Sequence, residues 1–348
     1  MVRIGVISKD TPSLSTVSKD MVYSFKKLGH SSEFYEYMVQ WYEAKGNMDK
    51  SVVVMTFDPL YCTAWFLMSR DHTRKGIHSA VYTTVEGVPK PWLVANWFRR
   101  DCVIVANSYF TEKMLKQVDI EPAGMIYHGV NLEQIAKARE KRGKNRSLMQ
   151  YRLNAKTIIG TVASSHPRKG LNLLAEAVKE ARKNSKDVGL YLISTEEARS
   201  RYSTVDGLYV DARFGGMERM ELLSFIAGFD YYLQPSLCEG FGLPVLEAMA
   251  LGVPVIIPDY EPLNEVASDA SSIKVPVIRE EERDLGDGIL YQCHYYEPSA
   301  MAKAILQAHE TREKDPKAYK NMCRAALNRA KTFDCVKNYS EFLKLWGL

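Results

Sequence analysis

The sequence has few of the features expected of a secreted or membrane-spanning protein. Its 348 residues include only six cysteines, and no two of them form a Cys-x-x-Cys pair. This spacing favours reduced thiols over a disulfide framework or a zinc site. No apolar run approaches the roughly 18 residues needed to cross a bilayer, and residues 1–7 are typical of a first strand rather than a signal peptide. We therefore expect a cytoplasmic protein.

An excess of charge is also missing. The net charge is only +4, whereas proteins that bind nucleic acid usually concentrate much more positive charge on one face. We expect no nucleic acid partner. The one strong shift in composition is residues 137–146, which carry six basic residues and one acidic residue. We interpret them as an exposed connecting helix or loop; contact with anionic lipid headgroups is the alternative.

Short β-branched segments alternate with amphipathic segments along the chain. This alternation indicates parallel sheets with helices on both faces. The length allows two such α/β domains. The expected strands are 2–7, 52–57, 79–85, 102–106, 125–128, 157–162, 188–193, 207–210, 230–234, 253–257 and 273–277. The expected helices are 16–28, 111–118, 170–184, 218–228, 244–251, 299–311, 316–331 and 335–346.

Residues 239–247 place two carboxylates around a glycine-rich turn. Gly240 and Gly242 allow a tight turn that can approach a ligand closely, and Pro244 suits the start of a helix. A strand, a turn and a helix N-terminus in succession direct free N–H groups at an anion. Glu247 can accept hydrogen bonds from hydroxyls in the same pocket, although it could merely compensate the helix dipole. Phosphate and hydroxyls together suggest a nucleotide sugar.

Arg168 and Lys169 follow another expected strand and precede a helix. Arginine grips two oxygens in a fork and lysine supplies a compact charge, so the pair suits a diphosphate. The alternative is a solvated surface pair. His166 beside them could donate to phosphate, although we favour a surface histidine there.

The stretch Gln-Pro-Ser-Leu-Cys-Glu-Gly-Phe-Gly-Leu-Pro-Val-Leu-Glu at 234–247 resembles the Glu-x7-Glu signature of retaining glycosyltransferases of family 4. The resemblance implies a GT-B fold, in which two doubly wound Rossmann-like domains face each other across a cleft. The implied division is an acceptor domain at 1–135, a connecting segment at 136–156, a donor domain at 157–332 and a C-terminal helix at 335–348 that crosses back onto the first domain.

The resemblance also implies roles for single residues. Arg168 and Lys169 would bind the donor phosphates and stabilise the leaving group, while Glu239 would take hydroxyls of the donor sugar; these three are the expected catalytic residues. Glu247 would take the ribose hydroxyls. The remaining expected donor contacts are Gly240, Phe241, Gly242, Leu243, Met217 and Phe214.

The expected acceptor residues lie in the first half. Glu86 ends a strand and could orient a hydroxyl or act as a base; a turn residue is the alternative. His128 falls in a segment that resembles the family's strand end, and Ser15 and Thr16 stand where the family often has two glycines. Residues 91–100 combine two tryptophans with two arginines, which indicates core packing or a patch for a lipid-linked acceptor and peripheral membrane contact.

No Asp-x-Asp sequence, which holds the metal of many sugar transferases, is present. We therefore expect no metal and no cofactor. The predicted function is retaining transfer of a sugar from UDP- or GDP-hexose to a hydroxyl of a glycan, lipid or other acceptor. The alternatives are a sugar-nucleotide-binding subunit without catalysis and another GT-B enzyme, such as a sugar-nucleotide epimerase.

Overall fold

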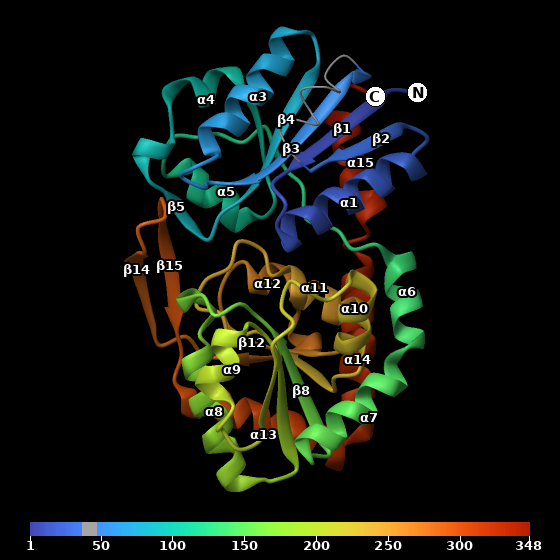
Figure 1. Cartoon of the computed structure of the whole chain (residues 1–348), viewed down its shortest axis with the longest axis vertical. Helices are drawn as coiled ribbons and strands as arrows, with labels where there is room; N and C mark the ends of the chain where they lie inside the picture. The colour runs from blue at the N-terminus through green and yellow to red at the C-terminus, as the bar shows by residue number, and fades with distance from the viewer. Residues whose placement is uncertain (37–46) are drawn as a thin grey trace.

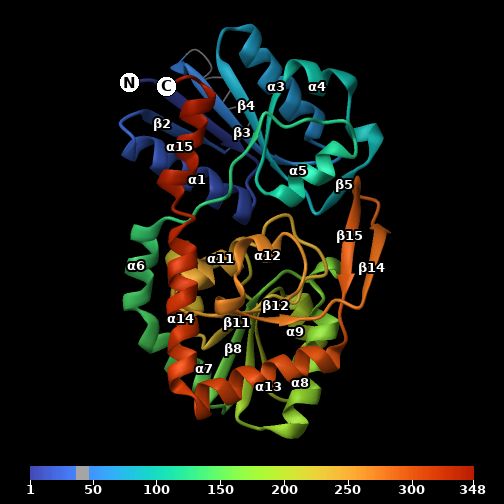
Figure 2. The same ribbon diagram turned by 180° about the vertical axis from the view of Figure 1, so that it is seen from behind.

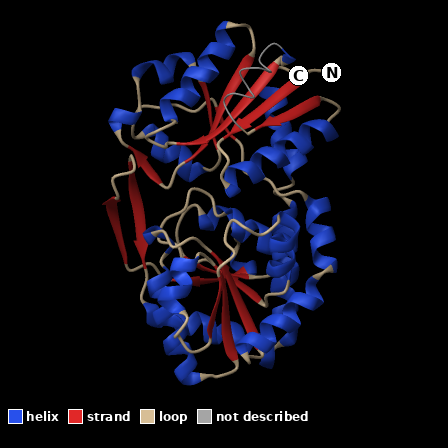
Figure 3. Cartoon of the chain, viewed as in Figure 1, coloured by secondary structure: helices blue, strands red, loops and turns tan. Residues whose placement is uncertain are grey.

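The computed structural model describes residues 1–36 and 47–348. Two α/β halves lie one above the other, and each is built around its own sheet (Figure 1). Helices cover both faces of both sheets (Figure 3). Within the described ranges, no helix combines the length and the apolar character required to cross a membrane.

The first half contains a sheet of six parallel strands in the order β2-β1-β3-β4-β6-β7. Its central strands are almost completely buried, as expected for a parallel sheet that is covered on both faces. The bounds are β1 (Arg3–Ser8), β2 (Ser31–Tyr35), β3 (Lys50–Thr56), β4 (His78–Thr84), β6 (Val103–Ala106) and β7 (Gly124–Met125).

Alternate residues of these strands feed two separate cores. Val52 and Val54 of β3 pack with one set of helices, whereas Val53 and Met55 pack with the other set. The first set is α1 (Pro12–Lys27) and α15 (Cys335–Leu345). The second set is α3 (Cys62–Arg74), α4 (Asn96–Asp101) and α5 (Tyr109–Lys116). The last helix of the chain therefore belongs to the core of the first half.

The second half repeats this design with six parallel strands in the order β10-β9-β8-β11-β12-β13. The strands are β8 (Thr157–Val162), β9 (Val188–Ile193), β10 (Leu208–Asp211), β11 (Tyr231–Leu233), β12 (Val255–Pro258) and β13 (Ser272–Val275). One face packs against α8 (Leu171–Asn184), α9 (Glu196–Tyr202) and α13 (Pro298–Lys314). The other packs against α6 (Leu132–Glu140), α7 (Arg142–Leu153), α10 (Arg219–Ala227), α11 (Leu243–Ala250), α12 (Leu263–Val266) and α14 (Pro316–Lys331). Short 3₁₀ turns occur at Pro91–Leu93, Pro167–Lys169 and Asp269–Ser271.

A β-hairpin joins the two halves. Strands β14 (Arg279–Asp284) and β15 (Ile289–Tyr295) are antiparallel and follow the second sheet in sequence, yet β15 pairs with β5 (Gly87–Pro89) of the first half. Figures 1 and 2 show the hairpin on the side opposite α6. A Cβ at Gly87 would lie 2.1 Å from the carbonyl oxygen of Leu290, so only glycine allows this close pairing.

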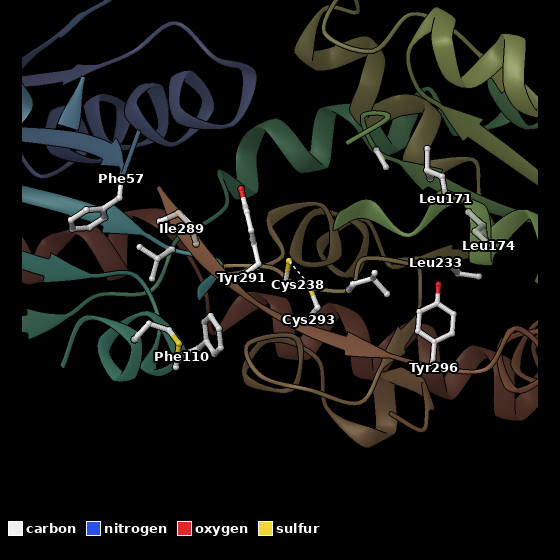
Figure 4. Close-up of a cluster of buried hydrophobic side chains, with 14 of the residues drawn as sticks. Phe57, Phe110, Leu171, Leu174, Leu233, Cys238, Ile289, Tyr291, Cys293 and Tyr296 are labelled. Atoms are coloured by element: carbon white, nitrogen blue, oxygen red, sulfur yellow. Dashed lines mark hydrogen bonds between the residues drawn. The ribbon is translucent and has the colours of Figure 1, made fainter. Parts of the chain in front are cut away.

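The tip of this hairpin is anchored by apolar contacts. Ile289 and Tyr291 are each 5% exposed and belong to a core that also contains Phe57 and Phe110 of the first half (Figure 4). Burying a side chain of this size, relative to leaving it exposed to water, contributes about 1.5–3 kcal/mol to the association of the two halves. The hydrophobic core is therefore continuous between the halves along β15.

The chain itself crosses between the halves at a second place. Val130 and Asp334 form an isolated parallel bridge, flanked by the hydrogen bonds Val130 N to Phe333 O (2.9 Å) and Cys335 N to Val130 O (3.1 Å). A Cβ at Gly129 would lie 2.3 Å from the Cα of Cys335, so glycine is required where the two crossing segments touch.

The structure confirms the predicted fold class, two doubly wound α/β units of the GT-B type. Some element bounds were wrong. The helix expected at 16–28 begins earlier, at Pro12, and the strand expected at 125–128 is only Gly124–Met125. The basic segment 137–146 lies in the two successive helices α6 and α7. The hairpin 279–295 was not predicted.

Candidate active site

The two sequence motifs meet where the neighbouring strands β8 and β11 end. After β8 the chain makes a 3₁₀ turn at Pro167–Lys169 and enters α8 through Gly170, whose φ is +63°. A Cβ at Gly170 would lie 2.3 Å from the carbonyl oxygen of Pro235. The N–H of Leu237 donates to the carbonyl oxygen of Arg168 (2.8 Å). These backbone contacts hold the two loops together.

Glu239 is the centre of the resulting charged cluster. Lys169 Nζ lies 2.5 Å from its Oε1, and Arg168 Nη1 lies 3.4 Å from its Oε2. The side-chain amide of Gln234 also donates to Oε1 (2.7 Å) and to Ser236 Oγ (2.8 Å). The structure thus brings the three predicted catalytic residues into direct contact, while their roles remain predictions.

The cluster keeps its carboxylate ionised. Burial raises the pKa of Glu239, but the charges of Lys169 and Arg168 outweigh it and bring the pKa to about 2. Burial and the neighbouring Arg168 lower the pKa of Lys169, against the attraction of Glu239. Burial also opposes the charge on Arg168, yet Glu86 and Glu239 raise the pKa of that group overall.

Glu86 reaches this cluster from the first half. It follows β4 and directly precedes β5, and its Oε1 lies 3.1 Å from Arg168 Nη2. Its carbonyl oxygen accepts the N–H of Gln292 in the hairpin (3.2 Å). Arg168 therefore bridges two carboxylates, one from each half. The predicted acceptor residue Glu86 is next to the three predicted catalytic residues.

The turn that follows Glu239 approaches the first half closely. A Cβ at Gly240 would lie 2.2 Å from Thr84 Oγ1, and its carbonyl oxygen accepts Ser108 Oγ (3.0 Å). Gly242 has φ +92° and starts α11. Among the described residues, no acceptor is found for the backbone N–H groups of Phe241 and Gly242. Two free N–H groups at a helix start provide an anion site.

Glu247 is held separately from this cluster. It lies in α11 and is 3% exposed, and its Oε1 is 2.6 Å from Arg219 Nη2. Asp20 of α1 adds a carboxyl group from the first half: burial raises its pKa to about 7, Arg219 opposes the rise and Glu247 adds to it. The second glutamate of the motif therefore sits beside an arginine and another carboxyl group.

His128 lies beneath the turn rather than open to a ligand. Tyr82 Oη donates to Ile126 O (2.7 Å) and lies 2.8 Å from His128 Nδ1, while Asn107 Nδ2 lies 3.0 Å from Nε2. Burial lowers the pKa of His128 to about 3, so the ring is neutral. With both nitrogens occupied and Phe241 packed edge-on at 4.9 Å, His128 supports the turn. Its acceptor role remains a prediction.

The other predicted contacts are more scattered. Ser15 is buried on α1 and donates to Asp10 (3.3 Å), and Thr16 is half-buried beside it. Phe214 follows β10 and is 37% exposed, while Met217 packs against the core of the second half. Leu243 opens α11 and packs against both the first-half and the second-half cores.

The aromatic segment 91–100 divides between core and surface. Trp97 packs edge-on against Phe66 and Phe98, with the guanidinium of Arg70 over its ring at 4.2 Å. Trp92 is 63% exposed. Membrane contact through this segment remains a prediction.

A cavity of about 280 Å³ lies beside the hairpin rather than at the charged cluster. None of the predicted site residues lines it. Its walls are Phe110, Lys113, Asp259, Tyr260, Glu261, Asn264, Glu280, Gln292 and His294.

Sequence reasoning missed four residues that organise the site. Gln234 had a usable signal, because it lies within the motif itself. Arg219 and Asp20 belong to no motif and are recognised only from their positions. Glu265 lies in α12, and its carboxylate accepts the N–H groups of Tyr109 (2.9 Å) and Phe110 (2.8 Å) and so caps α5 of the other half.

Comparison with known sequences identifies the second half most clearly. A family model described as glycosyl transferases group 1 matches residues 156–310. The chain is 23% identical over 346 residues to an uncharacterized glycosyltransferase of Sulfolobus islandicus rod-shaped virus 1, a match that covers 98% of this chain and 100% of the relative. It is 25% identical over 195 residues to a phosphatidyl-myo-inositol mannosyltransferase of Mycobacterium leprae, covering 55% of this chain and 48% of that protein.

Solved structures show the same arrangement of the two halves. The Anabaena protein HepE, determined in complex with UDP and glucose, has a TM-score of 0.68 with 12% sequence identity, and the match covers 100% of both chains. At this identity the likeness shows the fold. The group 1 glycosyltransferase model thus matches the second half of the chain, a glycosyltransferase is similar to it over its whole length, and the architecture is that of the GT-B fold.

Proposed function

We propose that the chain is a retaining, metal-independent transferase that moves a hexose from a nucleoside diphosphate hexose to a hydroxyl group. The observation that carries this proposal is the cluster of Arg168, Lys169 and Glu239 beside the free N–H groups of Phe241 and Gly242. It combines cations, backbone donors and one ionised carboxylate at the start of a helix. A diphosphate joined to a polyhydroxylated sugar needs this set of partners.

The reaction breaks the bond between the anomeric carbon and the diphosphate oxygen. Negative charge grows on that oxygen in the transition state, and fixed donors aimed at developing charge are usually the largest catalytic contribution. Arg168, Lys169 and the turn N–H groups supply those donors without a metal. A bond forms between the acceptor oxygen and the anomeric carbon on the same face, and the hydroxyl proton passes to the departing phosphate.

The ion pair between Lys169 and Glu239 suggests how the donor is received. Before binding, each group satisfies the charge of the other at 2.5 Å. A bound diphosphate gives Lys169 a second anion, and Glu239 can then accept hydrogen bonds from the sugar. Arg168 has the same relation to Glu86, which supports a role for this carboxylate of the first half in receiving the acceptor hydroxyl.

The proposed division of labour follows the two sheets. Residues 157–332 bind the donor and residues 1–135 bind the acceptor, with 136–156 connecting them and the helix at 335–348 completing the first domain. The acceptor is a hydroxyl of a glycan, a lipid or another molecule.

The test is release of nucleoside diphosphate by the purified protein. The donor panel contains UDP-glucose, because HepE was determined with UDP and glucose, and GDP-mannose, because the M. leprae relative is a mannosyltransferase. Each donor is offered with glycan and lipid acceptors in excess EDTA. We expect turnover, and proton NMR of the product should show the anomeric configuration of the donor. Turnover that requires added metal, or an inverted product, contradicts the proposal.

The same assay separates the alternatives. A binding subunit without catalysis would hold the nucleotide but release no diphosphate with any acceptor. An epimerase would alter the sugar nucleotide with no acceptor present. The buried cluster of Arg168, Lys169 and Glu239 favours catalysis over either alternative.

A further inference from the structure

Arg219 is a charged residue to which the proposed reaction gives no task. It is the first residue of α10, in the second half. Its Nη2 pairs with Glu247 Oε1 at 2.6 Å. Its Nε is covered by protein yet has no hydrogen-bond acceptor among the described residues. The side chain as a whole remains 25% exposed, so a ligand can approach the arginine from its exposed side.

An unsatisfied buried donor carries a cost that a purely structural pair would avoid. Leaving one N–H without a partner costs about 1–3 kcal/mol, and ion pairs away from water often gain little over apolar packing. An arginine that served only to neutralise Glu247 would gain nothing from a buried Nε–H without an acceptor. The free donor instead indicates that a ligand oxygen completes the site.

The pair offers complementary groups to a diol. Glu247 accepts hydrogen bonds from hydroxyls, and the Nε–H of Arg219 donates to a hydroxyl oxygen. A ribose presents two adjacent hydroxyls, each both donor and acceptor. A deoxyribose lacks one of them and would leave a buried group of the pair unsatisfied.

We propose that Arg219 is a specificity-determining residue that selects ribonucleotide over deoxyribonucleotide donors. It fixes the carboxylate of Glu247 and donates its Nε–H to the same ribose. The proposal rests on the proposed function, in which Glu247 takes the ribose hydroxyls. Asp20 approaches from α1, one helical turn after Thr16, so Arg219 also stands between carboxyl groups of both halves.

The experiment measures dissociation constants by titration calorimetry, which needs neither the acceptor nor the sugar. The probes are UDP against 2′-deoxy-UDP and GDP against 2′-deoxy-GDP, and the pair whose ribonucleotide binds is used. In the unaltered protein we expect the ribonucleotide to bind at least tenfold more tightly, since sites built around a hydroxyl reject analogues that lack it. In Arg219→Gln and in Glu247→Gln this ratio should fall to within about twofold of unity.

Two further variants make the result specific. Arg219→Lys keeps the charge but loses the Nε donor, and it should lose most of the ratio even if Arg219→Gln does not fold. Arg199→Gln removes an arginine from an exposed pair with Glu196 in the same half and should keep the full ratio.

The outcomes separate this inference from the proposed function. If Glu247→Gln loses the ratio while both Arg219 variants keep it, the role of Arg219 is wrong and the ribose contact of Glu247 stands. If Glu247→Gln and both Arg219 variants keep the ratio, Glu247 does not bind ribose. The donor-site assignment in the proposed function then fails as well. An unaltered protein that binds both nucleotides equally overturns the inference directly.

Discussion

Glu239 and Glu247 belong to one short motif but stand in different electrostatic surroundings. Glu239 contacts Lys169 and Arg168 from the neighbouring loop, and an amide donates to it at 2.7 Å. Glu247 has one arginine at 2.6 Å, and the buried carboxyl group of Asp20 lies near that arginine. The first region therefore holds two basic groups with two carboxylates, Glu239 and Glu86, whereas the second holds one basic group with two carboxyl groups.

The difference teaches which part of a donor each region can receive. Lys169 and Arg168 can exchange their protein carboxylates for a phosphate, because each is held in the site by salt bridges that a phosphate oxygen can replace. A phosphate beside Glu247 would meet two carboxyl groups and only one cation. Hydroxyls carry no charge and are tolerated there. The two ends of the motif thus suit different parts of one nucleotide sugar.

The sharpest way to break this comparison is Lys169→Ala. The variant removes the closest cation from the Glu239 region, and we expect turnover to fall by roughly 10²- to 10³-fold, the usual effect of losing one oxyanion donor. Steady-state release of nucleoside diphosphate measures it. Lys183→Ala, which removes an exposed lysine at the end of the helix α8 that follows Lys169, should retain the normal rate. A near-normal rate in Lys169→Ala contradicts the site.

Glu239→Gln tests the low pKa of the first glutamate. A carboxyl whose pKa is depressed from 4.5 to about 2 contributes stability above pH 4.5, and that stability is lost as the pH falls toward 2. At pH 7 we expect the variant to be less stable by on the order of 3 kcal/mol, with a smaller difference at pH 3. Urea unfolding at both pH values measures it. A difference that does not change with pH would show that the carboxyl titrates normally.

Asp20→Asn tests the second region, where the pKa of a carboxyl group is raised rather than lowered. Burial raises the pKa of Asp20 from 3.8 to about 7, so the folded protein holds that proton and loses stability as the pH rises from 3.8 through 7. Asparagine does not ionise. We expect the variant to be more stable by roughly 4 kcal/mol at pH 8 and to show no such gain at pH 4. Thermal unfolding midpoints at the two pH values give the answer, and a variant that is destabilised at pH 8 would refute the reasoning.

The smallest expected effect is that of Gln234→Leu. This change removes one hydrogen bond from Glu239 but neither basic neighbour. The carboxylate therefore loses about 1 kcal/mol of the interaction energy that holds it in position. We expect a three- to tenfold fall in kcat, on the scale of 1.4 kcal/mol per factor of ten. Gln117→Leu, an exposed glutamine after α5, is the matched control. A loss as large as that of Lys169→Ala would mean that Gln234 itself touches the substrate.

Local patterns predicted the donor side well. The strand, turn and helix around 239–247 depend on near neighbours, so the sequence predicted them directly. The meeting of Arg168, Lys169 and Glu239 followed because the carboxyl ends of parallel strands share one edge of a sheet. Glu86 could be named as a strand-end acid, but not its bond to Arg168, because that bond joins different halves.

Other features had no local signal. Strand β14 reads Arg-Glu-Glu-Glu-Arg-Asp, which lacks the apolar alternation by which strands are recognised. Its strand conformation comes from antiparallel pairing with β15 rather than from its own sequence pattern. Arg219 begins an ordinary helix, and Asp20 lies in the middle of another. Their proximity to Glu247 is a result of how the halves pack.

The pairing of β15 with β5 also limits how the two halves of this enzyme can move relative to each other. The chain crosses between the halves at residues 130 and 334, and the hairpin fastens them again at Gly87–Tyr291 on the opposite flank. Because the halves are connected on both flanks, they cannot open by a hinge at one edge alone. We expect one half to rotate relative to the other about the line that joins the two connections. This rotation would widen the interface on one side of that line and narrow it on the other. Nucleotide entry then needs no rupture of the sheet that keeps Glu86 facing Arg168.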